Sequence, residues 1–246
     1  MDGHAGRILI HEGGACNARV WRVEDGAGGV WIEKDFLKSP SIVRHTLGRF
    51  LVWRECSILR RLEKTGAAPG GVRRLTPFSL REDFVAGGTL HDADPGAYAL
   101  PPAPGEPPRN WMPAVPRAFF EAFEEAVRAV HRTGFVHLDL HNARNVMVAP
   151  GWKPVLVDWQ SALPTFWMPG FLRRAVERID LTGVDKLWDK FRPGELPPGR
   201  LRTLRQARFI RKYFWLPRLH RSRPRSDSPP PRPPADMGGK EREEGG

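Results

Sequence analysis

A run of polar residues lies between an amphipathic helix and two short strands, and it constrains the fold more than any other part of the chain. Apolar side chains recur at helical spacing over residues 117–133, and Gly134 closes the predicted helix. Residues 146–149 and 155–157 are apolar runs that predict strands, with a Pro-Gly turn between them. Acids that merely cap turns would not occur in this order and at these spacings, so we interpret the polar residues as a functional site.

The polar residues of this run suit phosphoryl transfer to a hydroxyl group. That reaction needs a carboxylate near the attacking oxygen, and it needs oxygen ligands that hold Mg²⁺ against the nucleotide phosphates. Asp139 is the predicted carboxylate, and Asn145 and Asp158 are the predicted metal ligands. Asn142 is an alternative to Asn145. His137 is grouped with the catalytic residues, and we expect it to brace the loop rather than to transfer protons.

The first ninety residues show the pattern of several strands and one helix. Apolar runs bounded by glycine turns predict strands over residues 7–11, 20–23, 30–36 and 79–85. Between the third and the fourth of these runs, residues 49–62 carry apolar side chains at helical spacing. The pattern therefore predicts a small β-rich unit that contains a single helix.

Three features of this unit do not indicate a function singly, but together they indicate a phosphate-binding site. A glycine-rich hairpin begins with Gly13 and Gly14 and runs to Val20, and its backbone N–H groups can approach phosphate oxygens with no Cβ in the way. Lys34 lies on the next predicted strand, and Glu55 lies on the helix. A carboxylate there would pair with Lys34 and hold its ammonium group toward a phosphate. Taken singly, a glycine turn and a solvated lysine are the ordinary interpretations of the first two features.

The whole series of motifs resembles the protein-kinase-like superfamily over roughly residues 8–190. The Val-His-Leu-Asp run at 136–139 is similar to the kinase catalytic loop, and Asp-Trp-Gln at 158–160 stands where the family has Asp-Phe-Gly. Phe84 and Val85 begin a stretch that is similar to the hinge that receives adenine. The resemblance implies a two-lobed α+β fold with a small β-rich N-lobe and a reduced helical C-lobe. It also implies ATP and Mg²⁺ as cofactors.

The departures from the kinase pattern point to a compact member of the superfamily. Asn145 lies six residues after Asp139 instead of five, with Arg144 at the usual position, which indicates a loop expanded by one residue. Gln160 replaces the family's glycine and restricts the backbone at the metal turn. No Ala-Pro-Glu motif follows, and the short remainder resembles the RIO-like kinases and the lipopolysaccharide-core sugar kinases of bacteria. His141 is also common in kinases of small molecules and sugars.

The net charge of +11 is concentrated in one segment of the chain. Residues 200–223 hold nine Arg and Lys residues and no acid, whereas residues 1–199 hold 26 basic and 23 acidic residues. Residues 200–222 predict a basic amphipathic helix, which either contacts an anionic membrane peripherally or packs on the larger lobe. No nucleic-acid-binding module accompanies this helix, so we do not expect nucleic acid as a partner.

Four regions are expected along the chain. They are the N-lobe at 1–85, the hinge with a Pro-rich insertion (93–116) and the reduced C-lobe at 86–199, the basic helix at 200–222, and a disordered tail at 223–246. Two cysteines argue against a disulfide scaffold, and the sequence contains neither a signal peptide nor an apolar run long enough to span a membrane. We therefore expect a cytoplasmic protein, with peripheral contact to the inner membrane face as an alternative.

The leading functional interpretation is an ATP-dependent phosphotransferase, similar to serine/threonine protein kinases, that transfers the γ-phosphoryl group to a Ser or Thr hydroxyl. The first alternative is a lipopolysaccharide-core sugar kinase that phosphorylates Kdo or heptose at the membrane, so the acceptor hydroxyl belongs to a protein or to a glycolipid. The second alternative is a pseudokinase scaffold that binds nucleotide without transferring phosphate. The presence of Lys34, Asp139 and Asp158 together argues against this scaffold.

Overall fold

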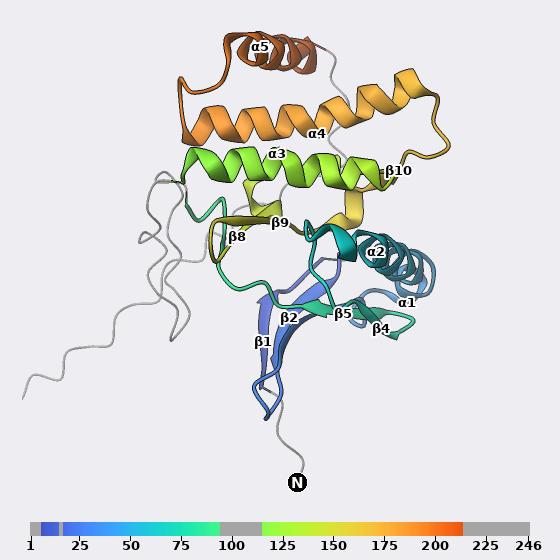
Figure 1. The fold of residues 1–246 in the computed structure, drawn as a ribbon. Helices are drawn as coiled ribbons and strands as arrows, with labels where there is room; N and C mark the ends of the chain where they lie inside the picture. The colour runs from blue at the N-terminus through green and yellow to red at the C-terminus, as the bar shows by residue number, and fades with distance from the viewer. Residues whose placement is uncertain (1–5, 15–16, 94–114, 214–246) are drawn as a thin grey trace, which may run out of the picture.

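The computed structural model describes residues 6–14, 17–93 and 115–213, with the backbone alone over 207–213. The chain is a mixed α+β protein, as the sequence predicts. An antiparallel sheet and one long helical segment form its N-terminal part, and helices dominate from residue 117 onward (Figure 1). Buried apolar side chains from both parts form one contiguous core.

Five antiparallel strands make the N-terminal sheet. Val20, Lys34 and Leu80 stand opposite one another on three neighbouring strands, so their side chains share one face of the sheet. Four of the strands agree with the sequence prediction, whereas β4 was not expected because it is exposed along its whole length and has no alternating pattern. In spatial order the strands are β1 (Gly6–His11), β2 (Arg19–Glu24), β3 (Val30–Asp35), β5 (Ser79–Asp83) and β4 (Arg73–Thr76).

The helical segment between β3 and β4 begins earlier than the apolar spacing predicts. α2 (Arg49–Leu62) has the expected bounds, but α1 (Ser41–Val43) and a π-helical turn (Arg44–Gly48) lead into it without a break. Apart from Gly48, this first stretch buries no residue, so no amphipathic pattern marks it. A Cβ at Gly48 would lie 3.1 Å from the side chain of Phe36, so the glycine allows the helix to approach the end of β3 closely.

The central part of the chain follows the predicted order of helix, loop and two strands. Gly134 ends the helix in the left-handed conformation, with a φ of 81°, as expected for a C-terminal glycine. The two strands pair antiparallel, and a short strand after β5 joins the same small sheet. These elements are α3 (Arg117–Arg132), β8 (Val146–Ala149), β9 (Lys153–Leu156) and β6 (Gly88–Thr89).

A two-stranded ladder brings the two predicted functional loops together. β7 (Phe135–Val136) leads into the loop that carries Asp139, and β10 (Leu163–Pro164) follows the turn that carries Asp158. The two strands pair antiparallel, with Val136 opposite Leu163. The loop of Asp139 therefore begins, and the turn of Asp158 ends, at the same two-stranded ladder.

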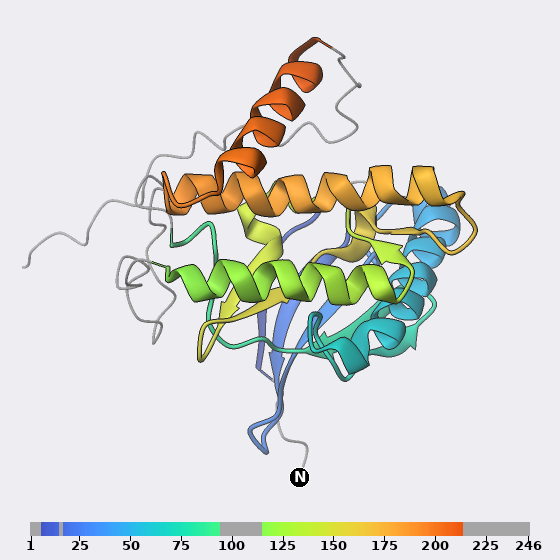
Figure 2. The same cartoon turned by 45° about the horizontal axis from the view of Figure 1, so that its top comes forward.

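Two further helices complete the molecule, α4 (Gly170–Phe191) and α5 (Pro198–Tyr213). α4 lies alongside α3, and α5 packs on the other side of α4 (Figures 1 and 2). A Cβ at Gly183 would lie 2.9 Å from the carbonyl carbon of Leu140, so this glycine lets α4 approach the loop of Asp139. The close packing of α4 therefore supports the loop from behind.

The basic helix predicted over 200–222 appears over residues 198–213 as α5, and one side of it packs on the rest of the chain, whereas Arg202 and Arg205 are exposed. Leu204 is buried, and Arg200 pairs with Asp185 of α4 and with Glu124 of α3. Residues 214–246 and the Pro-rich stretch 94–114 lie outside the described residues. No helix in the described part of the chain is long and apolar enough to cross a membrane.

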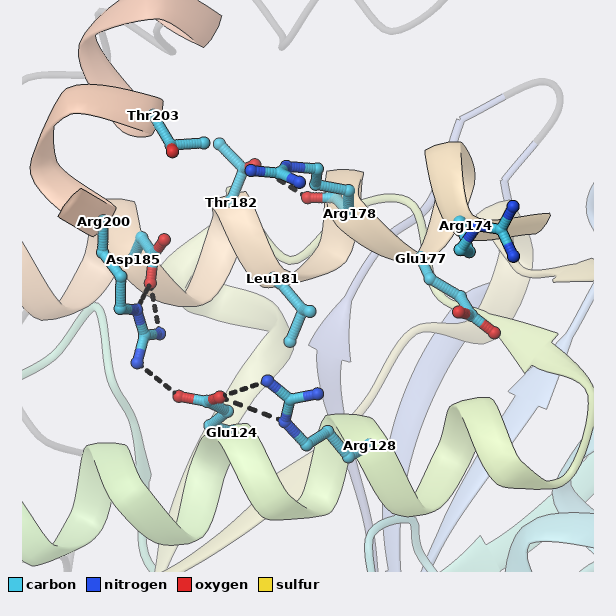
Figure 3. A pocket seen from close by; sticks show the side chains of 10 residues that line it. All are labelled: Glu124, Arg128, Arg174, Glu177, Arg178, Leu181, Thr182, Asp185, Arg200 and Thr203. Carbon is cyan, nitrogen blue, oxygen red and sulfur yellow. Dashed lines mark hydrogen bonds and ion pairs between the residues drawn. The ribbon is translucent and has the colours of Figure 1, made fainter. Parts of the chain in front are cut away.

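Charged residues surround a pocket of about 360 Å³ between α3, α4 and α5. Figure 3 shows Arg200 linking Asp185 to Glu124, which in turn accepts hydrogen bonds from Arg128. None of the predicted catalytic or ligand-binding residues lines this pocket. It is therefore a junction that anchors α5, and the candidate site lies elsewhere.

Glu124 makes the stability contributed by this junction dependent on pH. Burial alone would raise the pKa of Glu124, but hydrogen bonds from Arg128 and Arg200 outweigh burial and lower it. A carboxyl whose pKa is lower in the folded protein stabilises the fold above its unfolded pKa, and this stabilisation is lost as the pH falls through the folded value. We expect Glu124→Gln to lower the free energy of unfolding at pH 7 by up to about 1 kcal/mol, since the junction is partly solvated.

The difference between wild type and Glu124→Gln should shrink as the pH falls from the unfolded pKa of about 4.3 through the lower folded value, below which the carboxyl is protonated in both states. Urea denaturation between pH 3 and pH 7 measures this difference. Glu121→Gln, which removes an exposed ion pair with Arg117 on the same helix, is the matched control. An equal difference at pH 3 and pH 7 would contradict the ionic role of Glu124.

Candidate functional site

The inner face of the N-terminal sheet carries a buried lysine between two carboxylates. Lys34 Nζ lies 2.6 Å from Glu55 Oε1, so the pair expected from the sequence is formed. It also lies 3.1 Å from Glu82 Oε1 on β5. All three side chains are buried. Glu82 shares the inner face with Lys34 because it lies two residues after Leu80, which stands opposite Lys34 in the ladder.

The electrostatic balance of this cluster keeps Lys34 charged. Burial alone would lower the pKa of Lys34, but the carboxylates of Glu55, Glu82 and Asp158 outweigh burial and raise it. Burial, with Glu82 close by, raises the pKa of the Glu55 carboxyl in spite of its bond to Lys34. The cluster therefore holds one ammonium group and an excess of carboxylates. Asp158 is near enough for its charge to raise the pKa of Lys34.

A double-mutant cycle at Glu55 and Glu82 tests this balance. We expect Glu82→Gln alone to change the free energy of unfolding by less than about 1 kcal/mol, because one carboxylate still neutralises Lys34. The double variant with Glu55→Gln should lose about 3 kcal/mol or more, because it leaves a buried ammonium without a counter-charge. Urea denaturation of the four proteins gives the coupling. Additive losses would contradict a shared counter-charge.

The loop after β7 places Asp139 and Asn145 in direct contact. Asn145 is buried, and its Nδ2 donates to the Asp139 carboxylate at 2.8 Å (Oδ2) and to the Asp139 carbonyl oxygen at 3.1 Å. Asn142 accepts a hydrogen bond from the backbone N–H of Arg144 and caps the short 3₁₀ helix Ala143–Asn145, and its Nδ2 donates to Asn145 Oδ1 at 3.3 Å. A short helical turn between the two residues thus returns Asn145 to Asp139.

α4 fixes the loop of Asp139 through a buried carboxylate. Asp180 accepts hydrogen bonds from the backbone N–H groups of His137 and Leu138, at 2.8 and 2.7 Å, and from His131 Nε2 at 3.0 Å. Lys186 Nζ donates to the carbonyl oxygen of His141 at 2.9 Å. Asp180 and Lys186 thus connect the loop to α4. Leu138 itself has a φ of 66°, a strained conformation that these bonds help to hold.

His137 connects the loop of Asp139 to the turn of Asp158. Its ring is fully buried, and its Nε2 lies 3.0 Å from the carbonyl oxygen of Val157. The ring also packs against Trp159, with ring centroids 4.7 Å apart. These contacts agree with the bracing role expected for His137. Asp158 adopts the left-handed conformation, with a φ of 64°, and is exposed, so the turn presents its carboxylate to solvent.

The other residues predicted to bind nucleotide belong to the glycine-rich hairpin and to the hinge-like stretch. Val20 stands opposite Lys34 on the inner face. Phe84 and Val85 are half-buried in the link from β5 to the small sheet of β6 and β8. Gly13 and Gly14 line a pocket of about 200 Å³ that contains none of Lys34, Asp139 and Asp158. The two glycines of the hairpin are thus not brought to the lysine, and residues 15–16 lie outside the described residues.

Sequence reasoning missed two residues of this constellation. Glu82 gave no signal beyond its place in a predicted strand, because its partner Lys34 is set by the strand register. Arg22 shares the inner face of the sheet. Its guanidinium group lies over the ring of Phe84, and the guanidinium carbon is 5.0 Å from the ring centroid. Alternation along 20–23 places Arg22 on the side of Val20, and this is the signal that could have found it.

The sequence matches no protein-family model and no curated protein. Among the described residues, no group of three or more His, Cys, Asp and Glu side chains is arranged to hold a metal ion. The chemistry of the site is therefore inferred from its own residues: a buried, charged lysine, a carboxylate bound to an amide, and an exposed carboxylate on a strained turn.

Proposed function

We propose that the protein is an ATP-dependent phosphotransferase with a reduced, two-lobed kinase-like fold, and that it transfers the γ-phosphoryl group to a Ser or Thr hydroxyl. The observation that carries this proposal is the buried Lys34–Glu55 pair, with Asp158 close enough to raise the pKa of the lysine. A lysine held charged beside an exposed carboxylate suits binding of nucleotide phosphates with their metal ion. Asp139 and Asn145, in contact with each other, supply the remaining polar groups.

The donor set fits Mg·ATP. Mg²⁺ prefers oxygen ligands, and in nucleotide sites it is bound by one or two carboxylates together with phosphate oxygens rather than by a cage of protein ligands. Asp158 and the side-chain oxygen of Asn145 match this requirement. We assign Asn145 rather than Asn142 as the ligand, because Asn142 caps a helical turn whereas Asn145 is held against Asp139. When bound, the metal ion would neutralise charge on the phosphates.

The nucleotide contacts follow from the same geometry. Lys34 would bind phosphate oxygens from the inner face of the sheet, and Glu55 would keep its ammonium in place. Phe84 and Val85, at the link between the two sheets, would receive the adenine ring. Gly13, Gly14 and Val20 would cover the phosphates if the hairpin turns toward Lys34 on binding.

Asp139 is the proposed base of the reaction. Its Oδ2 accepts the amide of Asn145, which orients the carboxylate and leaves Oδ1 for the acceptor hydroxyl. Asp139 would accept the proton of that hydroxyl as its oxygen attacks the γ-phosphorus. Asp180 acts through the backbone, since it fixes the two residues that precede Asp139.

Transfer of label from γ-labelled ATP tests the proposal and its acceptor. The purified protein is incubated with Mg²⁺ and with host extract that has been separated into soluble protein, membrane and lipopolysaccharide fractions. We expect label on protein bands, and we expect it to depend on Asp139. Glu121→Gln, an exposed change on α3, is the matched control and should leave the label unchanged.

The remaining outcomes separate the alternatives. Asp139-dependent label on the glycolipid fraction would replace the protein acceptor by a sugar hydroxyl and keep the phosphotransferase. If no fraction is labelled although ATP with Mg²⁺ raises the melting temperature, the protein binds nucleotide without transferring phosphate. If ATP neither binds nor transfers label, the proposal fails.

A further inference from the structure

Large apolar side chains are exposed on two stretches of the chain that lie outside the candidate site. One stretch is the helical segment α1–α2, and the other is the connection from β10 into the first turn of α4. The exposed fractions of the six most prominent side chains run from 52% to 80%. They are Ile42, Phe50 and Trp53 in the first stretch and Phe166, Trp167 and Phe171 in the second.

These two stretches lie at the same end of the molecule. The start of α4 and the helices α1 and α2 lie on the same side of the ribbon in both views (Figures 1 and 2). Arg54 of α2 donates to the carbonyl oxygens of Gln160 and Ala162. Arg61 lies over Phe135, whose ring centroid is 6.5 Å from that of Phe166. The two stretches therefore form one surface, which we call the aromatic end.

The aromatic end is strongly basic. Residues 36–61 contain six Arg and Lys residues, of which Lys38 pairs with Glu12, and a single acid, Glu55, which is buried against Lys34. Residues 159–176 contain two arginines and no acid. The next acid, Glu177, is paired with Arg173. Exposed aromatic and aliphatic side chains are thus surrounded by positive charge that few carboxylates offset.

We propose that the aromatic end docks on an anionic lipid bilayer. Trp and Phe side chains insert at the level of the headgroups, and Arg and Lys side chains attract anionic lipids, so this combination matches a peripheral membrane surface. An exposed patch of this kind on a folded protein marks an interaction site. Nucleic acid fits less well, because Ile42 and the neighbouring Leu47, both exposed, offer no stacking surface to a base.

This membrane surface differs from the one expected at residues 200–222. In α5, Leu204 is buried and Arg200 is paired with acids of two helices, so this part of the helix packs on the protein, whereas Arg202 and Arg205 are exposed. The aromatic end, in contrast, has its apolar side chains exposed. Docking at this end does not depend on phosphoryl transfer.

Vesicle flotation with the full chain tests the proposal. The probes are vesicles of phosphatidylcholine with 30% phosphatidylglycerol and vesicles of phosphatidylcholine alone (about one anionic lipid in three gives the surface a negative potential). We expect binding to the anionic vesicles only. The triple change Phe166→Ala, Trp167→Ala and Phe171→Ala should weaken this binding by about tenfold or more, because three side chains that enter the interface are lost.

Two control variants carry matched changes elsewhere. Ile8→Ser with Ile10→Ser removes equally exposed apolar side chains from β1, and Arg202→Gln with Arg205→Gln removes exposed charges from α5. Both should bind anionic vesicles like the wild type. All variants should keep the wild-type melting temperature, because every changed side chain is exposed.

Fluorescence gives a second measurement that does not depend on affinity. Lipids brominated along the acyl chain should quench the wild-type tryptophan emission, and Trp53→Phe with Trp167→Phe should remove most of that quenching. Three results would overturn the proposal: no binding to anionic vesicles, loss of binding in the α5 variant but not in the triple variant, or binding to duplex DNA but not to vesicles.

Discussion

Replacement of Asp139 by asparagine should lower the rate of phosphoryl transfer by about 10²- to 10³-fold and leave ATP affinity nearly unchanged. The Asp139 carboxylate contacts Asn145, and in the proposed reaction it accepts the proton of the acceptor hydroxyl. An asparagine keeps the size and the hydrogen bond but cannot serve as a base. Initial rates with γ-labelled ATP, and melting temperatures with and without Mg·ATP, measure the two effects separately.

The Glu121→Gln protein serves as the reference in both measurements. A transfer rate in Asp139→Asn equal to that of the reference would exclude Asp139 as the base. An equal loss of ATP binding and of transfer would instead indicate that Asp139 acts on the nucleotide. Comparison of kcat with KM separates these two outcomes.

Replacement of Asp180 by alanine should lower the free energy of unfolding by about 3 to 5 kcal/mol. The carboxylate is buried and accepts three hydrogen bonds, from His131 Nε2 and from the backbone N–H groups of His137 and Leu138. Alanine leaves these three buried donors without an acceptor. It also releases the strained backbone of Leu138, which directly precedes Asp139.

Urea denaturation measures the loss, with two comparison variants. Asp180→Asn retains one acceptor oxygen and should lose roughly half as much stability. Thr182→Ala on the same helix removes a hydroxyl that bonds only within the helix, and it should change stability by no more than about 0.5 kcal/mol. If Asp180→Ala is as stable as Thr182→Ala, the three hydrogen bonds do not anchor the loop.

The spacing of apolar side chains along the sequence predicts most of the secondary structure. The bounds of α2 and the start of α3 follow from apolar side chains at helical spacing, and Gly134 marks the end of α3, because its left-handed φ favours glycine. Elements without a buried stripe were missed or shortened. β4 is exposed throughout, and α1 with its π-helical turn buries only Gly48, so neither produces a pattern that sequence reasoning can recognise.

The sequence by itself also brought the main polar groups into one hypothesis, because a strand with Lys34, a helix with Glu55 and a loop with Asp139 follow one another along the chain. The pairing of Lys34 with Glu55 is the part of that hypothesis that geometry bears out directly. Tertiary structure decided the rest. Glu82 reaches Lys34 through the register of two strands, and Asp180 reaches the loop of Asp139 across more than forty residues.

The sequence and the tertiary structure also determine different properties of the protein surface. The sequence alone determined where positive charge is dense, since charge can be counted along a chain. It did not determine which charges and aromatic side chains remain exposed, because burial depends on which helices pack together. Packing on α4 engages Arg200 and buries Leu204 of α5, whereas the aromatic residues of α2 and of the stretch before α4 stay at the surface. Only the fold brings those residues to one end of the molecule.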